Sequence, residues 1–201
     1  MPDRNWRELL PKLARVSWVG AREVMAVHRD GTVQSVKLKD GGEVALLADE
    51  NASGAMGEEW ERILSDIKRM DEEDSATHTL IESGELLGIT DPLDGSGIFQ
   101  RCTLLPRHAP VLGWGSTVCV MECGVVMVAV IHQIATRQLF VAIKGEGCWW
   151  ISGADYDRFW DQGELPELRE EMRFRIADLS PPDATTQPVI TSAPSSSKMG
   201  E

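Results

Sequence analysis

The stretch Leu86-Leu87-Gly88-Ile89-Thr90-Asp91-Pro92-Leu93-Asp94-Gly95-Ser96 decides the fold of this chain. Its first five residues predict a short buried strand, which Pro92 should end because proline cannot donate a hydrogen bond to a sheet. Gly95 accepts backbone conformations that other residues avoid, and a helix beginning near Ser96 would present free N–H groups to an anion. The two aspartates would then hold divalent metal beside a phosphate. The alternative is a turn with two solvated carboxylates.

The composition is compatible with an enzyme that acts on a small-molecule substrate. The 201 residues suffice for one packed domain, or for a domain and an incomplete second one. A net charge of −12 argues against nucleic acid and anionic membranes as partners. The longest apolar run, Val125 to Ile131, is too short to span a bilayer, and the N-terminus lacks a signal pattern. We therefore expect a soluble, cytoplasmic protein.

The cysteines and histidines suggest no further chemistry. The four cysteines form no C-x-x-C pair and are expected to be buried free thiols: Cys102, Cys119, Cys123 and Cys148. The four histidines lie beside no plausible nucleophile and are assigned no role: His28, His78, His108 and His132.

The remaining pattern predicts an α+β organisation. We expect one helix from Pro11 to about His28, and a second from just past Asp49 through Met70. The acidic run 71–74 should follow as a solvated loop rather than a metal trap. A short helix is expected from Glu164 to Glu171. Strands are expected at residues 33–38, 79–81, 116–121, 124–132, 138–143 and 187–192.

Three segments in order resemble the inositol monophosphatase superfamily, which includes 3'(2'),5'-bisphosphate nucleotidases and fructose-1,6-bisphosphatases. Residues Asp91 to Ser96 match its D-P-I/L-D-G-S/T motif, with Phe99 at the expected short spacing. Residues Lys39 to Asp49 are similar to its K-x-D-G-x-x-V-T-x-A-D segment, and Leu139 to Cys148 to its hairpin ending in K-G-x-G-A. The resemblance covers roughly residues 10–150 and implies a layered α/β sugar-phosphatase-type fold, with an antiparallel sheet and flanking helices.

The resemblance also implies a two-magnesium site. One Mg²⁺ would be held by Glu82, Asp91 and the backbone carbonyl of Leu93, with Glu85 as a rival for Glu82. A second Mg²⁺ would bridge from Asp91 to Asp94 and to a further aspartate near the C-terminus. Hard oxygen ligands of this kind suit Mg²⁺.

Catalysis in such a family uses metal-activated water rather than a covalent intermediate. By resemblance, Asp49 and Ser96 would orient the water, and Glu82 would act with them through its metal. The amides of Gly95, Ser96 and Gly97 would hold the substrate phosphate.

One family motif, W-D-x-A-A, is absent from the sequence, since Trp160-Asp161 comes too early and lacks the two alanines. We therefore expect a C-terminally truncated member with an incomplete second layer. Its expected parts are a metal-binding phosphatase domain at 1–148, an insertion or linker at 149–185 and the start of a truncated domain at 186–201.

Two functions follow from the resemblance. The first is a Mg²⁺-dependent, lithium-sensitive phosphomonoesterase that hydrolyses inositol phosphate or 3'-phosphoadenosine 5'-phosphate, as a homodimer. The alternative is a catalytically impaired homologue that keeps a weak metal site and acts through dimer contacts. A Rossmann-type nucleotide site at Gly145-Glu146-Gly147 is disfavoured because the G-x-x-G continuation is missing.

Overall fold

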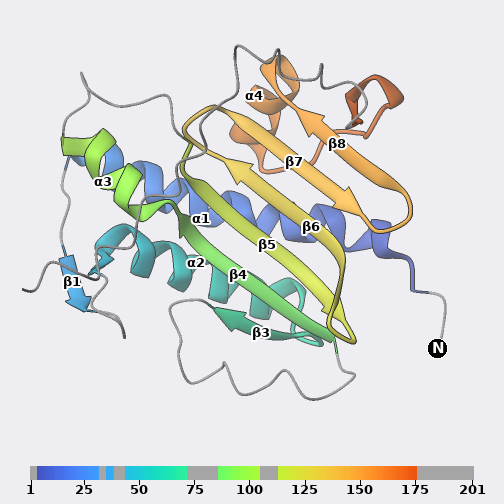
Figure 1. The fold of residues 1–201 in the computed structure, drawn as a ribbon, viewed down its shortest axis with the longest axis horizontal. Helices are drawn as coiled ribbons and strands as arrows, with labels where there is room; N and C mark the ends of the chain where they lie inside the picture. Colours follow the sequence, from blue (N-terminus) through green and yellow to red (C-terminus); the bar gives the residue numbers. More distant parts are fainter. Residues whose placement is uncertain (1–3, 32–34, 39–43, 72–85, 105–112, 176–201) are drawn as a thin grey trace, which may run out of the picture.

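A seven-stranded mixed sheet with helices against one face forms the body of the molecule (Figure 1). The computed structural model describes residues 4–31, 35–38, 44–71, 86–104 and 113–175. Strands β3 to β9 follow one another across this sheet in chain order, and β1 and β2 form a separate two-stranded ribbon. Only the β3–β4 pair in the large sheet is parallel, and the other neighbouring pairs are antiparallel. The predicted α+β class is confirmed.

The described helices interrupt the strands at several points along the chain, whereas β5 to β8 follow one another directly. The helical segments are η1 (Trp6–Glu8), α1 (Leu10–Asp30), α2 (Leu47–Ile63), α3 (Ser96–Leu104), α4 (Gly153–Gln162) and η4 (Glu170–Met172). The strands are β1 (Ser35–Leu38), β2 (Val44–Leu46), β3 (Lys68–Asp71), β4 (Leu86–Asp94), β5 (Gly115–Glu122), β6 (Val125–Gln133), β7 (Gln138–Ile143), β8 (Gly147–Ile151) and β9 (Arg173–Phe174). Within the described ranges, no helix is long and apolar enough to cross a membrane.

Helix α1 forms as its sequence predicts. Pro11 stands in the first turn, where its missing N–H costs nothing. Gly31 ends the helix in a left-handed conformation (φ 65°), and its N–H donates to the carbonyl of His28 at 3.2 Å. Four of its apolar residues are buried against the sheet and α2: Leu13, Val16, Val24 and Val27.

Helix α2 is shorter than predicted. It ends at Ile63, and Met70, which was expected in the helix, belongs to β3. The indole Nε1 of Trp60 donates to the carbonyl of Ile67 at 2.7 Å and draws the turn after the helix into the core. Apolar spacing therefore continues past the helix end because the turn packs on the same surface.

Strand β4 does not stop at Pro92, contrary to prediction, but continues to Asp94. Its pairing with β5 shifts register between Asp91 and Asp94, so the proline lies where the ladder is interrupted. Proline is tolerated at such irregularities because no regular hydrogen bond is lost.

The hairpins β5–β6–β7 confirm the strands predicted at 116–121, 124–132 and 138–143. The predicted strand at 33–38 is confirmed for residues 35–38, and those at 79–81 and 187–192 lie outside the described residues. The helix expected from Glu164 to Glu171 is wrong, since only the turn η4 forms there. Gly163 ends α4 in a left-handed conformation (φ 70°), and residues 163–169 adopt no regular secondary structure.

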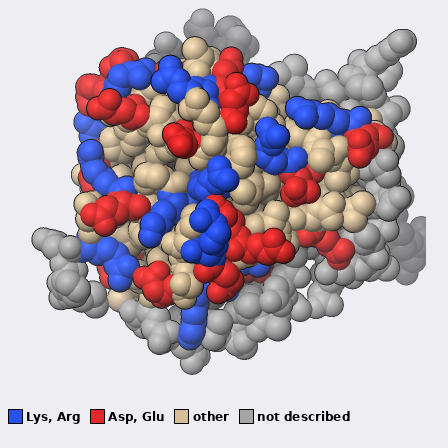
Figure 2. Space-filling view, turned by 180° about the vertical axis from the view of Figure 1, so that it is seen from behind, with Lys and Arg blue, Asp and Glu red and all other residues tan. Residues whose placement is uncertain are grey.

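The two faces of the sheet differ in cover and polarity. Helices α1 and α2 pack on the inner face, while the outer face, turned to the viewer in Figure 1, carries no described helix. Figure 2 shows the opposite side of the molecule, where basic and acidic side chains are interspersed. Glu59 of α2 accepts from Arg15 of α1 at 3.1 Å and from Arg62 at 2.6 Å.

A buried polar chain joins α1, the sheet and α4. His132 of β6 is fully buried; its Nδ1 lies 3.1 Å from the hydroxyl of Ser17, and its Nε2 lies 2.8 Å from the hydroxyl of Tyr156. Ser17 in turn lies 3.1 Å from the hydroxyl of Ser116. Burial lowers the pKa of His132 to about 3, so the ring is neutral near pH 7.

The contact between Gly88 and Trp60 should be intolerant of any added atom. A β-carbon at Gly88 would lie 2.0 Å from ring atoms of the fully buried Trp60. We expect Gly88→Ala to lower the free energy of unfolding by about 3 kcal/mol or more in urea titrations. The matched control is Gly54→Ala on α2, where a β-carbon meets nothing within 4 Å. That change should raise stability by about 0.5–1 kcal/mol, and equal effects of the two would contradict this packing.

His132 should make stability depend on pH. Its pKa is depressed in the folded state, so the unfolded chain alone binds a proton as the pH falls below about 6.5. The stability that comes from keeping His132 neutral is therefore present above pH 6.5 and is lost progressively as the pH falls toward 3. We expect urea unfolding of the protein to lose roughly 2 kcal/mol more between pH 7 and pH 5 than unfolding of His132→Gln. Parallel pH profiles for the two proteins would contradict the assignment.

Candidate functional site

The two candidate metal aspartates lie on either side of the irregularity near the end of β4. Asp91 is half-buried and pairs opposite Thr117, while Asp94 is exposed and pairs opposite Gly115. Between them the side chain of Leu93 is 3% exposed and belongs to the core, so only its backbone carbonyl is suited to bind a ligand. The bulge therefore gives the two carboxylates different environments within four residues.

Gly95 turns the chain directly from β4 into α3. Its φ of +84° lies in the left-handed region, where a side chain is strained. The Gly95 carbonyl accepts from the N–H groups of Ile98 at 2.8 Å and Phe99 at 2.9 Å, which starts the first helical turn. The amides of Ser96 and Gly97 are thus placed at the N-terminus of α3 immediately after Asp94, as predicted, and helix N-termini favour anions.

Asp49 lies in the first turn of α2 and is 1% exposed. Its Oδ2 accepts from the backbone N–H of Leu46 at 3.1 Å, which caps the helix. Leu46 and Ala48 share one buried cluster with Leu93 and Phe99. The start of α2 is therefore packed against the same core as the turn that carries the candidate site.

Asp71 is buried. The prediction that it belongs to a solvated loop is wrong. Asp71 ends β3, is 2% exposed, and its Oδ2 accepts from Arg69 at 2.8 Å, Ser53 at 3.0 Å and Thr90 at 2.8 Å. Because β3 and β4 are parallel with Asp71 opposite Thr90, the carboxylate lies beside the residue that precedes Asp91. An arginine two positions before the acid was the one local sign of a buried pair. Residues 72–74 lie outside the described part of the chain.

Glu82 and its rival Glu85 also lie outside the described residues, so their placement stays a prediction. Among the residues that are described, no three His, Cys, Asp or Glu side chains gather as a metal-binding group. The oxygen donors near the end of β4 nevertheless fit Mg²⁺ by type: two carboxylates, Asp91 and Asp94, and the carbonyl of Leu93. A complete ligand set needs at least one further carboxylate.

The histidines with described positions serve packing. The Nδ1 of His28 lies 2.8 Å from the hydroxyl of Thr103, and burial lowers the pKa of His28. His78 and His108 lie outside the described residues. The expectation of buried thiols is confirmed for Cys119 and wrong for Cys123, which is exposed in the turn between β5 and β6.

The chain matches no protein-family model, and no curated protein matches it. Solved structures do match it. The IMPase of Thermotoga maritima is 23% identical, with a TM-score of 0.55, and the match covers 70% of this chain and 50% of that one. CysQ of Bacteroides thetaiotaomicron, a bacterial member of the inositol monophosphatase family, is 17% identical, with a TM-score of 0.54 and coverage of 74% and 50%. An IMPase/NADP phosphatase solved with Mg²⁺ and phosphate is 16% identical, with a TM-score of 0.51 and coverage of 69% and 50%.

The chain spans about half the length of the solved structures that it matches. At these identities the likeness concerns the fold alone. The resemblance seen in the sequence is thereby confirmed at the level of architecture: over 69–74% of its length, the chain shares its fold with about half of each of these inositol monophosphatase-type structures.

Proposed function

We propose that this chain is a Mg²⁺-dependent phosphomonoesterase that acts on a small phosphate ester, such as inositol phosphate or 3'-phosphoadenosine 5'-phosphate. One observation carries the proposal: Asp91 and Asp94 flank a bulge that leads directly into the N-terminus of α3. Carboxylates for cations and amides for an anion thus adjoin within one turn. The fold supports the same conclusion, since a solved neighbour at 16% identity holds Mg²⁺ and phosphate.

The metal ligands in this proposal are Asp91, Asp94, the carbonyl of Leu93 and Glu82, with Glu85 as the rival of Glu82. Bound Mg²⁺ supplies a water of lowered pKa and neutralises the phosphate and the leaving oxygen. The two aspartates offset that charge and fix the position of the ions. Since carboxylates alone repel a phosphate, substrate binding should depend on the metal.

The remaining roles fall to the turn and to the first residue of α3. The amides of Gly95, Ser96 and Gly97 hold the phosphate oxygens, because N–H groups of a first helical turn have no intrahelical acceptor. The hydroxyl of Ser96 and the carboxylate of Asp49 orient the attacking water. Asp49 also caps α2, so it is fixed before substrate arrives.

A second candidate function is docking by a catalytically impaired homologue, as a homodimer or with a complete relative. The observation in its favour is an apolar row across the outer face of the sheet. Ile131 pairs opposite Phe140, and Phe140 pairs opposite Trp150. Ile131 is 41% and Trp150 is 42% exposed, and the Phe140 and Trp150 rings stack with centroids 6.4 Å apart. Contiguous exposed apolar surface of this kind favours a protein partner.

Phosphate release by the purified chain tests the first proposal. The panel is inositol 1-phosphate, 3'-phosphoadenosine 5'-phosphate and fructose 1,6-bisphosphate, each with Mg²⁺, with EDTA, and with Mg²⁺ plus lithium. We expect Mg²⁺-dependent, lithium-sensitive release from one substrate, and a loss of about 100-fold or more in Asp91→Asn and in Asp94→Asn, because each change removes a metal ligand. The control Glu61→Gln alters an exposed carboxylate on α2 and should leave release unchanged.

Comparing Glu82→Gln with Glu85→Gln then identifies the third carboxylate, since only the ligand should weaken Mg²⁺ binding in calorimetry. Unchanged turnover in Asp91→Asn would contradict the assignment of Asp91 as a metal ligand. If a folded sample releases no phosphate from any of the three substrates, the second function is favoured. That function also requires that sedimentation shows a dimer and that Trp150→Lys dissociates it.

The turn at Gly95 should be sensitive to a side chain, and its neighbour should not. Gly95→Ala places alanine at φ +84° and should lower the free energy of unfolding by about 1–2 kcal/mol. Gly97→Ala adds a β-carbon with nothing within 4 Å, inside α3, and should raise it by up to about 1 kcal/mol. Chemical denaturation measures both. A neutral Gly95→Ala would mean that the turn does not need its left-handed conformation.

A further inference from the structure

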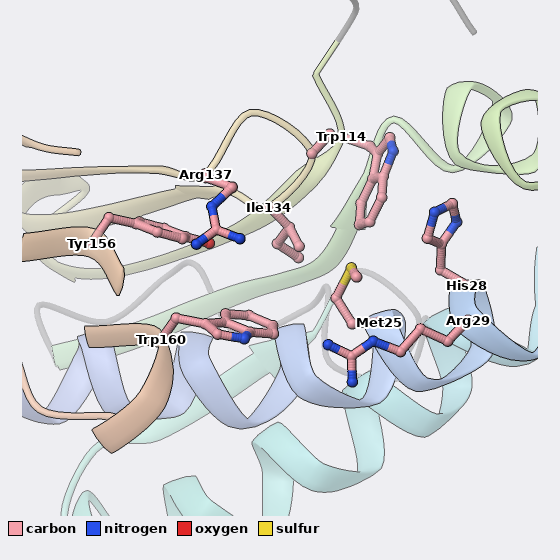
Figure 3. Close-up of a pocket in the computed structure, with 9 residues that line it drawn as sticks. Met25, His28, Arg29, Trp114, Ile134, Arg137, Tyr156 and Trp160 are labelled. Atoms are coloured by element: carbon pink, nitrogen blue, oxygen red, sulfur yellow. The ribbon is translucent and has the colours of Figure 1, made fainter. Parts of the chain in front are cut away.

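A cavity of about 210 Å³ lies between α1, the β6–β7 turn and α4 (Figure 3). It is lined by residues from four separate segments, among them His28 and Arg29 of α1, Trp114 before β5, Arg137 of the turn, and Tyr156 and Trp160 of α4. Its described lining includes no acidic residue, although the whole chain carries a net charge of −12. The described lining therefore contains two arginines and no carboxylate, although Asp157 pairs with Arg137 from outside the lining.

Arg29 supplies an available positive charge. Figure 3 shows its side chain extending from α1 toward Trp160 along the edge of the cavity. Within the described residues its guanidinium has no hydrogen bond or ion pair. An arginine in this state presents five N–H donors in a fixed plane, which suits carboxylate and phosphate oxygens.

Arg137 approaches the same space from the β6–β7 turn, beside Tyr156 (Figure 3). It is one of two described non-glycine residues with a positive φ, at 57°. Such a conformation costs about 1–2 kcal/mol, and here it closes the turn between the paired residues Gln133 and Gln138, which fixes where the Arg137 side chain starts. Its ion pair with Asp157 is exposed on both sides, at 63% and 54%, and pairs of this kind are weak enough to rearrange around a ligand.

The aromatic walls are fixed before any ligand binds. Trp160 stacks on Tyr156 at 6.4 Å and 11°, and its carbonyl accepts from the indole of Trp18 at 2.7 Å. Trp114 meets Phe99 edge-to-face at 5.0 Å. Rigid aromatic walls reduce the entropy lost when a planar ligand is bound. The volume is below that of pockets for drug-sized ligands, which points to a single ring.

We propose that this cavity binds a small organic anion with one planar apolar ring, its acidic group between Arg29 and Arg137 and its ring against Trp114 and Trp160. The site is separate from the candidate metal site, because none of its lining residues is a proposed ligand of metal or phosphate. The proposal does not depend on phosphatase activity.

Titration of the full chain with 4-fluorobenzoate, followed by fluorine NMR, tests this site. We expect saturable binding that Arg29→Gln and Arg137→Gln each weaken about tenfold, because each removes a charged hydrogen bond. The matched control is Arg158→Gln. Arg158 is an exposed arginine on α4, the helix that carries Tyr156 and Trp160, but it does not line the cavity. The neutral analogue 4-fluorobenzyl alcohol should bind at least tenfold more weakly.

Asp91→Asn should leave benzoate binding unchanged, which separates this site from the proposed catalytic one. The proposal is overturned if binding does not saturate, if the alcohol binds as well as the benzoate, or if Arg158→Gln weakens binding as much as Arg29→Gln. A loss of benzoate binding in Asp91→Asn would equally overturn it, since the anion would then lie at the metal site.

Discussion

The buried carboxylate of Asp71 is the interaction on which the arrangement of the candidate site depends. It binds together three elements, because its donors come from α2 (Ser53), β3 (Arg69) and β4 (Thr90). A buried charge without partners would cost several kcal/mol, so the three elements are held in one relative position by the need to satisfy it. β4 places Asp91 one residue after Thr90, and Asp49 lies in the first turn of α2. The distance between the two halves of the site is thus set by a residue outside it.

The sheet beyond β4 is fixed by a different device. Where α2 and β4 meet through Trp60 and a glycine, α1 and α4 meet the sheet through the neutral ring of His132. Both ring nitrogens have hydroxyl neighbours, one from Ser17 on α1 and one from Tyr156 on α4. Satisfied polar chains of this kind specify a single packing arrangement, since any other leaves a buried group unpaired. The same hydrogen-bonded side chains also fix the position of Tyr156, which lines the cavity between α1 and α4.

Local patterns in the sequence were enough for much of the fold and for the turn that carries the D-P-L-D-G-S motif. The hairpins β5 to β7 follow from alternation and turn residues, and the turn at Gly95 follows from a contiguous motif. Asp71 could not be read this way, because its hydroxyl donors stand 18 and 19 residues away along the chain. The end of α2 was missed because the turn that follows keeps helical apolar spacing. The cationic cavity draws on four distant segments, so no window of sequence contains it.

The two proposed sites would bind anionic ligands in two physically different ways. Near Gly95, a β-carbon of which would lie 3.5 Å from the Trp114 β-carbon, the charges available are two carboxylates and a set of amides. Amide dipoles alone do not offset two carboxylates, so a phosphate binds there only with cations added from solution. In the cavity lined by Trp114, the positive charge belongs to the side chains of Arg29 and Arg137, so an anion there needs no metal ion. Removing divalent metal should therefore empty the first proposed site and leave the second intact, because their positive charges come from different sources.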